Sequence, residues 1–172
     1  GPFWHPERGQ LFWFDILHSR LLSQGAGGME EWSFPEMVSA AGWVSDDVLI
    51  LAGERDLFLF DLETEEVETL VELEADKPGN RPNDGRADPQ GGFWIGTMSK
   101  TEAQGCGAIY RYHRGELRRL YSGISCPNAI CFTPDGRHAY YSDNGTPYVM
   151  KVALDGAVVE PGAGKPAISG EA

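Results

Sequence analysis

A short turn recurs along the chain at a nearly fixed interval, and this repeat constrains the fold more than any other feature. Pro6, Pro89 and Pro134 each stand in a Gly-containing turn beside strand-like apolar runs. Pro89 and Pro134 are 45 residues apart, Pro6 and Pro89 are 83 apart, and a turn at 45–47 falls near the middle of the longer gap. A unit of about 40–45 residues holding three to four strands is typical of a β-propeller blade.

The runs around these turns predict strands throughout, because helical periodicity is nowhere sustained. Expected strands include 11–16, 31–34, 48–52, 57–61, 67–71, 93–97, 108–112, 117–121, 138–142 and 148–152, with a last turn at 155–156. A β-sandwich would also give short strands with regular turns, but it would not repeat turn, strand, strand, turn, strand at this interval. The sequence therefore predicts an all-β fold, a β-propeller with about four blades.

Composition narrows the classes of partner and environment. The chain of 172 residues carries a formal net charge of -12, which argues against nucleic acid or an anionic membrane as partner. No apolar run approaches the roughly 18 residues of a membrane span. The three cysteines form no CxxC pair and are odd in number, so a disulfide framework is not expected and a cytoplasmic location is the default.

The two ends suggest a piece of a longer chain. The sequence begins at Gly1 without an initiator Met, on a strand approach, and it stops in a loop-like segment at Ala172. A closed ring of four blades is possible, but we expect residues 1–172 to form a single incomplete propeller domain that is truncated at both ends.

Two asparagines occupy equivalent places in neighbouring predicted blades. Asn83 lies six residues before Pro89, and Asn128 lies six before Pro134. If the loop before each innermost strand points at the propeller axis, the two amides converge there, whereas the second blade offers only Ala40 or Ala41. Paired amide oxygens suit a hard divalent cation or a sugar hydroxyl equally well, although a metal would also need carboxylates that are not evident. The alternative is that both are turn residues that cap their own loops.

Other polar and aromatic residues carry weaker signals. The histidines show no ligand spacing, and Asp143 at a strand end could support the site. Trp13, Trp43 and Trp94 are expected in the core between sheets. No GxSxG elbow, P-loop or dinucleotide motif is present.

Several longer stretches of the sequence resemble one protein family, the regucalcin and gluconolactonase family of senescence marker protein-like sugar lactonases. The resemblance covers essentially the whole chain, and its most specific part is the RxNDG…GTM pairing. The stretches that carry it are GPFW at 1–4, LFWFDI at 11–16, RPNDG at 81–85, DP at 88–89, GTM at 96–98, PNAI at 127–130, DG at 135–136 and YYSD at 140–143.

The resemblance implies a six-bladed propeller and one divalent cation (Ca, Zn, Mn or Mg) held by a Glu, an Asn and an Asp. The Asn corresponds to Asn128. The Glu would directly precede Gly1, and the Asp, also the general base, would lie beyond Ala172, so no catalytic residue is expected in this chain. The substrate-binding Arg and Asn correspond to Arg81 and Asn83. A further contact falls on Thr101 and is not carried over.

The family activity is the metal-dependent hydrolysis of a sugar lactone such as gluconolactone, a carboxylic ester hydrolysis. With two of three metal ligands missing, the 172-residue piece is expected to be incompetent. Two other hypotheses remain open: a calcium- or small-ligand-binding propeller without catalysis, and an interaction scaffold of the WD-repeat kind. The polar convergence of Arg81, Asn83 and Asn128 counts against the scaffold.

Overall fold

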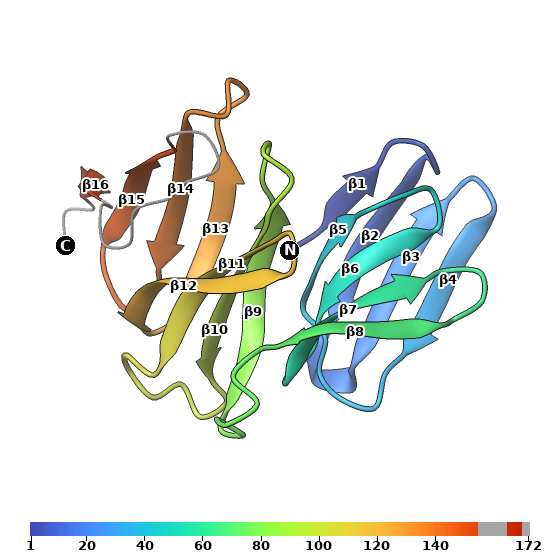
Figure 1. Ribbon diagram of the computed structural model, residues 1–172, viewed down its shortest axis with the longest axis horizontal. Helices are drawn as coiled ribbons and strands as arrows, with labels where there is room; N and C mark the ends of the chain where they lie inside the picture. The colour runs from blue at the N-terminus through green and yellow to red at the C-terminus, as the bar shows by residue number, and fades with distance from the viewer. Residues whose placement is uncertain (155–164, 170–172) are drawn as a thin grey trace. The chain divides into compact units, whose positions relative to one another are not determined.

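The computed structural model describes residues 1–154 and 165–169, which form four four-stranded sheets (Figure 1). Within each sheet the strands follow one another in chain order. The chain divides into two compact units, residues 1–82 and 83–172. The predicted turn at 155–156 lies outside the described residues. None of the described residues forms a helix long and apolar enough to cross a bilayer.

The first unit holds two complete sheets and most of the connection to the next. The first sheet is followed directly by the second, and a single 3₁₀ helix, η1 (Ile16–His18), interrupts the chain between β2 and β3. The strands of the first sheet are β1 (Phe3–His5), β2 (Gln10–Asp15), β3 (Arg20–Gly25) and β4 (Gly28–Ser33). Those of the second sheet are β5 (Ala40–Trp43), β6 (Val48–Ala52), β7 (Asp56–Asp61) and β8 (Val67–Glu72).

The second unit repeats the pattern with longer strands. The third sheet contains β9 (Asn80–Ala87), β10 (Phe93–Ser99), β11 (Gly107–His113) and β12 (Glu116–Ile124). The fourth contains β13 (Pro127–Phe132), β14 (His138–Asp143), β15 (Tyr148–Ala153) and β16 (Lys165–Ser169). Strand β9 begins at the last residues of the first unit, so its first three residues fall on that side of the division.

The recurring turns all join the first and second strands of a sheet. In the first sheet, His5 pairs with Gln10 across the turn. In the third and fourth, the amides of Asp88 and Thr133 donate to the carbonyls of Gly92 (2.7 Å) and His138 (2.9 Å). The second sheet closes the same hairpin between Val44 and Val48 (2.8 Å). The turn that recurs in the sequence therefore corresponds to one hairpin, between the first and second strands, that recurs in every sheet.

This placement corrects one detail of the sequence analysis. Asn83 and Asn128 were both expected in loops ahead of the innermost strand of a blade; instead they lie within β9 and β13, the first strands of their sheets. The misleading signal was proline, which cannot donate to a strand ladder. Strands β9 and β13 each lie at the edge of a sheet, where Pro82 and Pro127 are tolerated because one side of the strand has no ladder partner.

Each unit has its own apolar core between its two sheets. In the first, Phe12, Leu21, Leu49 and Leu51 are fully buried, and Phe34 packs against the Phe60 ring at 5.0 Å. In the second, the core contains Trp94, Ile109, Ile130, Ala139 and Val152 among others. Trp94 is completely buried as expected, but Trp43 is 43% exposed, so the expectation that it belongs to the core was wrong.

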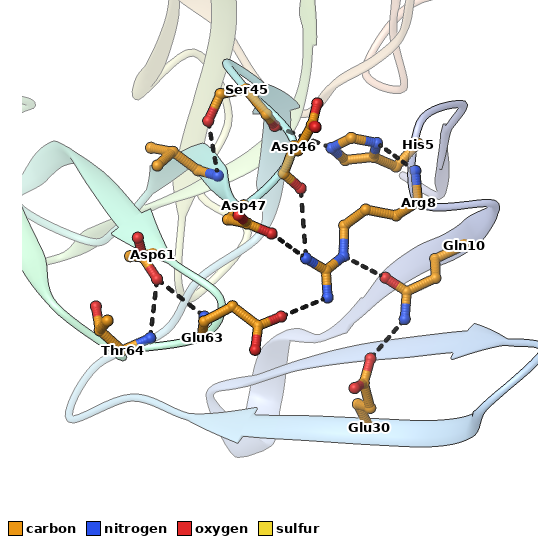
Figure 2. A network of polar contacts seen from close by, with 11 residues as sticks. His5, Arg8, Gln10, Glu30, Ser45, Asp46, Asp47, Asp61, Glu63 and Thr64 are labelled. Carbon is orange, nitrogen blue, oxygen red and sulfur yellow. Dashed lines mark hydrogen bonds and ion pairs between the residues drawn. The ribbon is translucent and has the colours of Figure 1, made fainter.

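A polar network also links the two sheets of the first unit (Figure 2). The guanidinium of Arg8, in the first hairpin, donates to Gln10 Oε1 (2.6 Å) and Glu63 Oε1 (2.9 Å) and pairs with Asp47. Asp47 lies in the turn between β5 and β6, and Glu63 lies in the turn between β7 and β8. The Arg8 side chain therefore links the first hairpin of the first sheet to two turns of the second sheet. The carboxylates are more than half exposed, whereas the Arg8 side chain is 17% exposed.

Candidate functional site

The two asparagines singled out from the repeat are in direct contact in the second unit. Asn83 Nδ2, on β9, donates to Asn128 Oδ1 (3.1 Å) and to the carbonyl oxygen of Pro127 (2.9 Å), both on β13. Both side chains are half-buried. The contact to a backbone carbonyl fixes which end of the Asn83 amide is the donor, and Asn83 in turn directs the oxygen of Asn128 toward itself.

Side chains of β9 also bind β13 along the edge that has no hydrogen-bonded strand partner in the part of the chain that the structure describes. The backbone N–H of Ile130 donates to Asp84 Oδ2 (2.8 Å), and Arg86 Nε donates to the carbonyl oxygen of Ile130 (3.0 Å). An edge strand leaves such groups without ladder partners, and buried backbone groups need a partner from elsewhere. Here the neighbouring strand supplies it through side chains, which holds β9 and β13 side by side (Figure 1).

A bulge in β13 sets the direction of Asn128. The pairing of β13 with β14 shifts register between Asn128 and Cys131, and Ala129 adopts a φ of 56°. A non-glycine residue in this left-handed region costs energy and persists only when its surroundings hold it. The bonds that Asp84 and Arg86 make to Ile130, the next residue, are well placed to hold the strained segment.

Asp143 secures the segment on the other side of Asn128. Its carboxylate accepts hydrogen bonds from the backbone N–H groups of Ser125 (3.0 Å), Cys126 (2.8 Å) and Gly145 (3.2 Å). The residue is buried. The sequence analysis raised a supporting role for Asp143, and these contacts show how it restrains the approach to β13.

A half-buried thiol completes the surroundings of the amide pair. Asn128 Nδ2 donates to Cys126 Sγ at 3.5 Å, and Cys126 Sγ lies 3.7 Å from the sulfur of Met98 on β10. The cysteine is not part of a disulfide. Because the nitrogen of Asn128 faces sulfur and its oxygen faces Asn83, the amide has one defined orientation, with one further oxygen lone pair available to a ligand.

Arg81 lies at the start of β9, in the first unit. Its Nη1 donates to the carbonyl oxygen of the next residue, Pro82 (2.9 Å), and the side chain is half-buried. The preceding residue, Asn80, is anchored by Glu74 Oε2 (2.8 Å), and the same buried carboxylate pairs with Lys77 (2.7 Å). The start of the strand is therefore fixed by a buried polar cluster, one that the sequence analysis did not find.

The described residues supply few ligands for the divalent cation that the family resemblance implies. Among the described residues, no group of three or more His, Cys, Asp and Glu side chains is gathered closely enough to hold an ion. Asn128 offers an amide oxygen of the kind that hard cations accept. The described part of the chain thus fits one ligand position of an oxygen-rich site and not a complete site.

Together, the four blade-like sheets define a β-propeller protein, in which a fixed polar pair lies on two adjacent first strands. The sequence profile described as the SMP-30/Gluconolactonase/LRE-like region matches residues 1–171, and the chain belongs to this family. The resemblance seen in the sequence is confirmed.

Individual relatives agree with this assignment. A Rhizobium meliloti protein provisionally named a sugar lactone lactonase is 37% identical over 94% of this chain and 55% of its own length. The L-arabinolactonase of Azospirillum brasilense is 31% identical over 84% of this chain and 50% of its own length. The chain thus spans about half the length of these relatives.

A solved structure confirms the fold class. The calcium-binding protein regucalcin from Agrobacterium tumefaciens superposes with a TM-score of 0.93 at 38% identity, covering 98% of this chain and 58% of that protein. The prediction of an all-β propeller with about four blades in this chain is therefore confirmed.

Proposed function

We propose that the whole protein containing this chain hydrolyses a sugar lactone to the corresponding hydroxy acid with the help of one divalent cation. Support comes from relatives named as lactonases, including the L-arabinolactonase and a 6-deoxy-6-sulfogluconolactonase of Pseudomonas putida at 29% identity. The observation that carries the proposal is the Asn83–Asn128 pair, because its two amides are held in fixed orientations by backbone and thiol contacts. Such preorganisation is what a catalytic or binding site requires.

Each candidate residue has a distinct role in this proposal. Arg81 and Asn83 would hold the ring and its hydroxyl groups, through guanidinium and amide hydrogen bonds. Asn128 would give one oxygen to the cation, which when bound would polarise the lactone carbonyl and acidify a water molecule. The proton of that water must pass to a general base, and no described residue is assigned that role.

Ring opening then needs only water as co-reactant. The water oxygen bonds to the carbonyl carbon, the bond from that carbon to the ring oxygen breaks, and the ring oxygen leaves as a hydroxyl after taking up a proton. Asn83 would keep the carbonyl carbon in a fixed place during this change, because its amide is braced against the Pro127 carbonyl.

A second candidate function is the binding of calcium or a small ligand without turnover. It is favoured by the similarity to regucalcin, whose structure is described as that of a calcium-binding protein. An amide oxygen on a rigid strand would serve a binding site as well as a catalytic one. The two functions differ only in whether bound lactone is opened.

Assays of the whole protein on gluconolactone and arabinolactone separate the two. We expect acid release that stops when metal is removed by a chelator and returns with Ca²⁺, Zn²⁺, Mn²⁺ or Mg²⁺. Tight binding of Ca²⁺ by calorimetry with no acid release from either lactone would instead support the binding function. Activity that survives complete metal removal would refute the metal dependence.

The 172-residue chain, prepared alone, provides a further test. By family resemblance it holds one of three metal ligands, so we expect neither tight metal binding nor turnover. Metal-dependent lactone hydrolysis by this purified piece would contradict the assignment of ligands.

A further inference from the structure

A second recess lies on the first unit and involves none of the residues of the candidate lactone site. It measures about 300 Å³, and its apolar wall is made of Phe34, Val38, Phe58 and Val67. Glu36 and Asp56 line it as well. Small-molecule sites have this volume and this composition, which is a mostly apolar wall with a few polar groups.

The apolar wall is rigid on one side and accessible on the other. Val38 is fully buried and Phe58 is 5% exposed, whereas Val67, on β8, is 57% exposed. The ring of Phe34, in the segment that leaves β4, lies 5.9 Å from the ring of Phe58, on β7, in a tilted arrangement. A ligand could therefore enter past Val67 and rest against aromatic surfaces that are already in place.

Two carboxylates face this space with oxygen atoms to spare. Glu36 Oε2 accepts from Arg55 Nε (3.0 Å), and Asp56 Oδ2 accepts from the hydroxyl of Thr69 (3.4 Å). No hydrogen bond from the described residues reaches the other oxygen of either carboxylate. Those two oxygens converge above Gly53: a Cβ there would lie 2.6 Å from Glu36 Oε1 and 3.1 Å from Asp56 Oδ1.

The charge balance of the recess favours a cation. Two carboxylates face one guanidinium, and Arg55 lies on the solvent side with 68% of its side chain exposed. The Glu36 side chain is 16% exposed. Burial and the negative charge of Glu36 raise the pKa of Asp56, as expected for a carboxylate whose charge is incompletely balanced.

The aromatic wall indicates which kind of cation fits. Phenylalanine faces attract organic cations through the ring quadrupole, and their apolar surface holds a hydrocarbon body. A divalent metal ion is less suited, because it takes six or more oxygen ligands and the recess offers two unbonded carboxylate oxygens beside apolar carbon.

We propose that this recess binds a small organic ammonium ion, with the nitrogen between Glu36 and Asp56 and an apolar body against Phe34 and Phe58. An ammonium group can donate to both free oxygens at once, since it carries several N–H donors. The site does not depend on the proposed lactonase function.

The test compares two probes of the same shape on the whole protein. Benzylammonium chloride is expected to bind saturably, with chemical-shift changes in amides of residues 34–38 and 53–58, and benzyl alcohol at least about tenfold more weakly. Glu36→Gln and Asp56→Asn should each weaken benzylammonium binding by roughly tenfold. Gly53→Ala should also weaken it, because the new methyl group displaces the Glu36 carboxylate.

Glu68→Gln is the matched control. Glu68 is an exposed residue of β8 that pairs with Leu59, and it does not line the recess, so this variant removes the same charge without touching it. Its affinity should equal that of the wild type. The proposal is overturned if the alcohol binds as well as the ammonium ion, if CaCl₂ displaces benzylammonium at equal concentration, or if no shifts appear at these amides. The two-probe comparison uses wild-type protein and so holds even if a variant fails to fold.

Discussion

The two units join their successive sheets by different means, although the sheets have the same strand order. In the first unit, the link at the first strands is mainly aromatic: His5 lies 5.1 Å from the Trp43 ring and contacts the carbonyl oxygen of Ser45 (3.1 Å). In the second, side chains of Asn83, Asp84 and Arg86 bind the backbone of β13. The polar link fixes both amides of the candidate site, whereas the aromatic link presents no comparable pair.

The residue before the turn proline shows the same contrast. His5 is fully buried and precedes Pro6, and Asp88 is buried and precedes Pro89. Asp88 accepts hydrogen bonds from Gly92 N (2.8 Å), Trp94 Nε1 (3.1 Å) and Arg111 Nε (2.5 Å). The first hairpin of the second unit is thus held by a buried ion pair, while the hairpin of the first relies on the more exposed Arg8 network.

The largest expected effect comes from breaking the buried ion pair. Asp88→Ala should lower the free energy of unfolding by about 3–5 kcal/mol, because it removes the buried carboxylate that pairs with the Arg111 guanidinium and accepts hydrogen bonds from Gly92 and Trp94. Urea denaturation measures the loss. Asp135→Ala, an exposed carboxylate in the equivalent hairpin of the fourth sheet, is the control and should lose much less. Equal losses of unfolding free energy in the two variants would contradict a larger contribution of the buried ion pair to stability.

The same pair predicts a pH dependence. Burial alone would raise the pKa of Asp88, but hydrogen bonds from Arg111, Gly92 and Gln90 outweigh it and hold the pKa below its usual value. A lowered folded-state pKa gives stability that is present above the unfolded pKa and is lost as pH falls through the folded one. The stability advantage of wild type over Asp88→Asn should therefore shrink in acid below pH 4 or so. A stability advantage of the wild type that grows in acid would contradict a lowered pKa of Asp88 in the folded protein.

An intermediate effect is expected at the polar link between β9 and β13. Asp84→Ala removes the acceptor for Ile130 N and should cost about 1–3 kcal/mol, the penalty for an unsatisfied amide. It should also reduce lactone turnover, since the bulge that directs Asn128 loses a restraint. Asp84→Asn keeps a side-chain oxygen and should lose less of both. If the two variants behave alike, the hydrogen bond is not what holds the bulge.

The smallest effect is expected in the Arg8 network of the first unit. Arg8→Ala should cost about 1 kcal/mol, because its carboxylate partners are largely exposed and such pairs are weak. The difference from wild type, measured by urea denaturation, should fall further in 1 M salt as charges are screened. A loss as large as that of Asp88→Ala, or one that salt leaves unchanged, would remove the contrast between the units.

Much of this architecture could be predicted because it rests on repetition. The turn interval predicted four blade-like units, and the equal spacing of Asn83 and Asn128 from their turn prolines predicted that the two meet. The family resemblance supplied the roles of Arg81, Asn83 and Asn128, which stay predictions.

The remainder depends on tertiary contacts that leave little trace in the sequence. Pro82, Asn83, Asp84 and Gly85 have low strand propensity, yet they form β9 because β10 supplies a ladder on one side and β13 lies on the other. Asp84 read as a turn residue, although its partner, Ile130, is 46 positions away. Trp43 and Trp94 have similar positions in the sequence repeat, but only Trp94 is buried in the core of its unit, whereas Trp43 is 43% exposed.

The central claim is that Asn128, oriented by Asn83, belongs to a metal-dependent lactone-hydrolysing site. The most direct measurement is the rate of gluconolactone hydrolysis by the whole protein against metal concentration, for wild type, Asn128→Ala and the exposed control Asn144→Ala. We expect Asn128→Ala to lose metal affinity and turnover by on the order of 100-fold, with Asn144→Ala unchanged. An Asn128→Ala protein with the metal dependence and rate of the wild type would contradict the account.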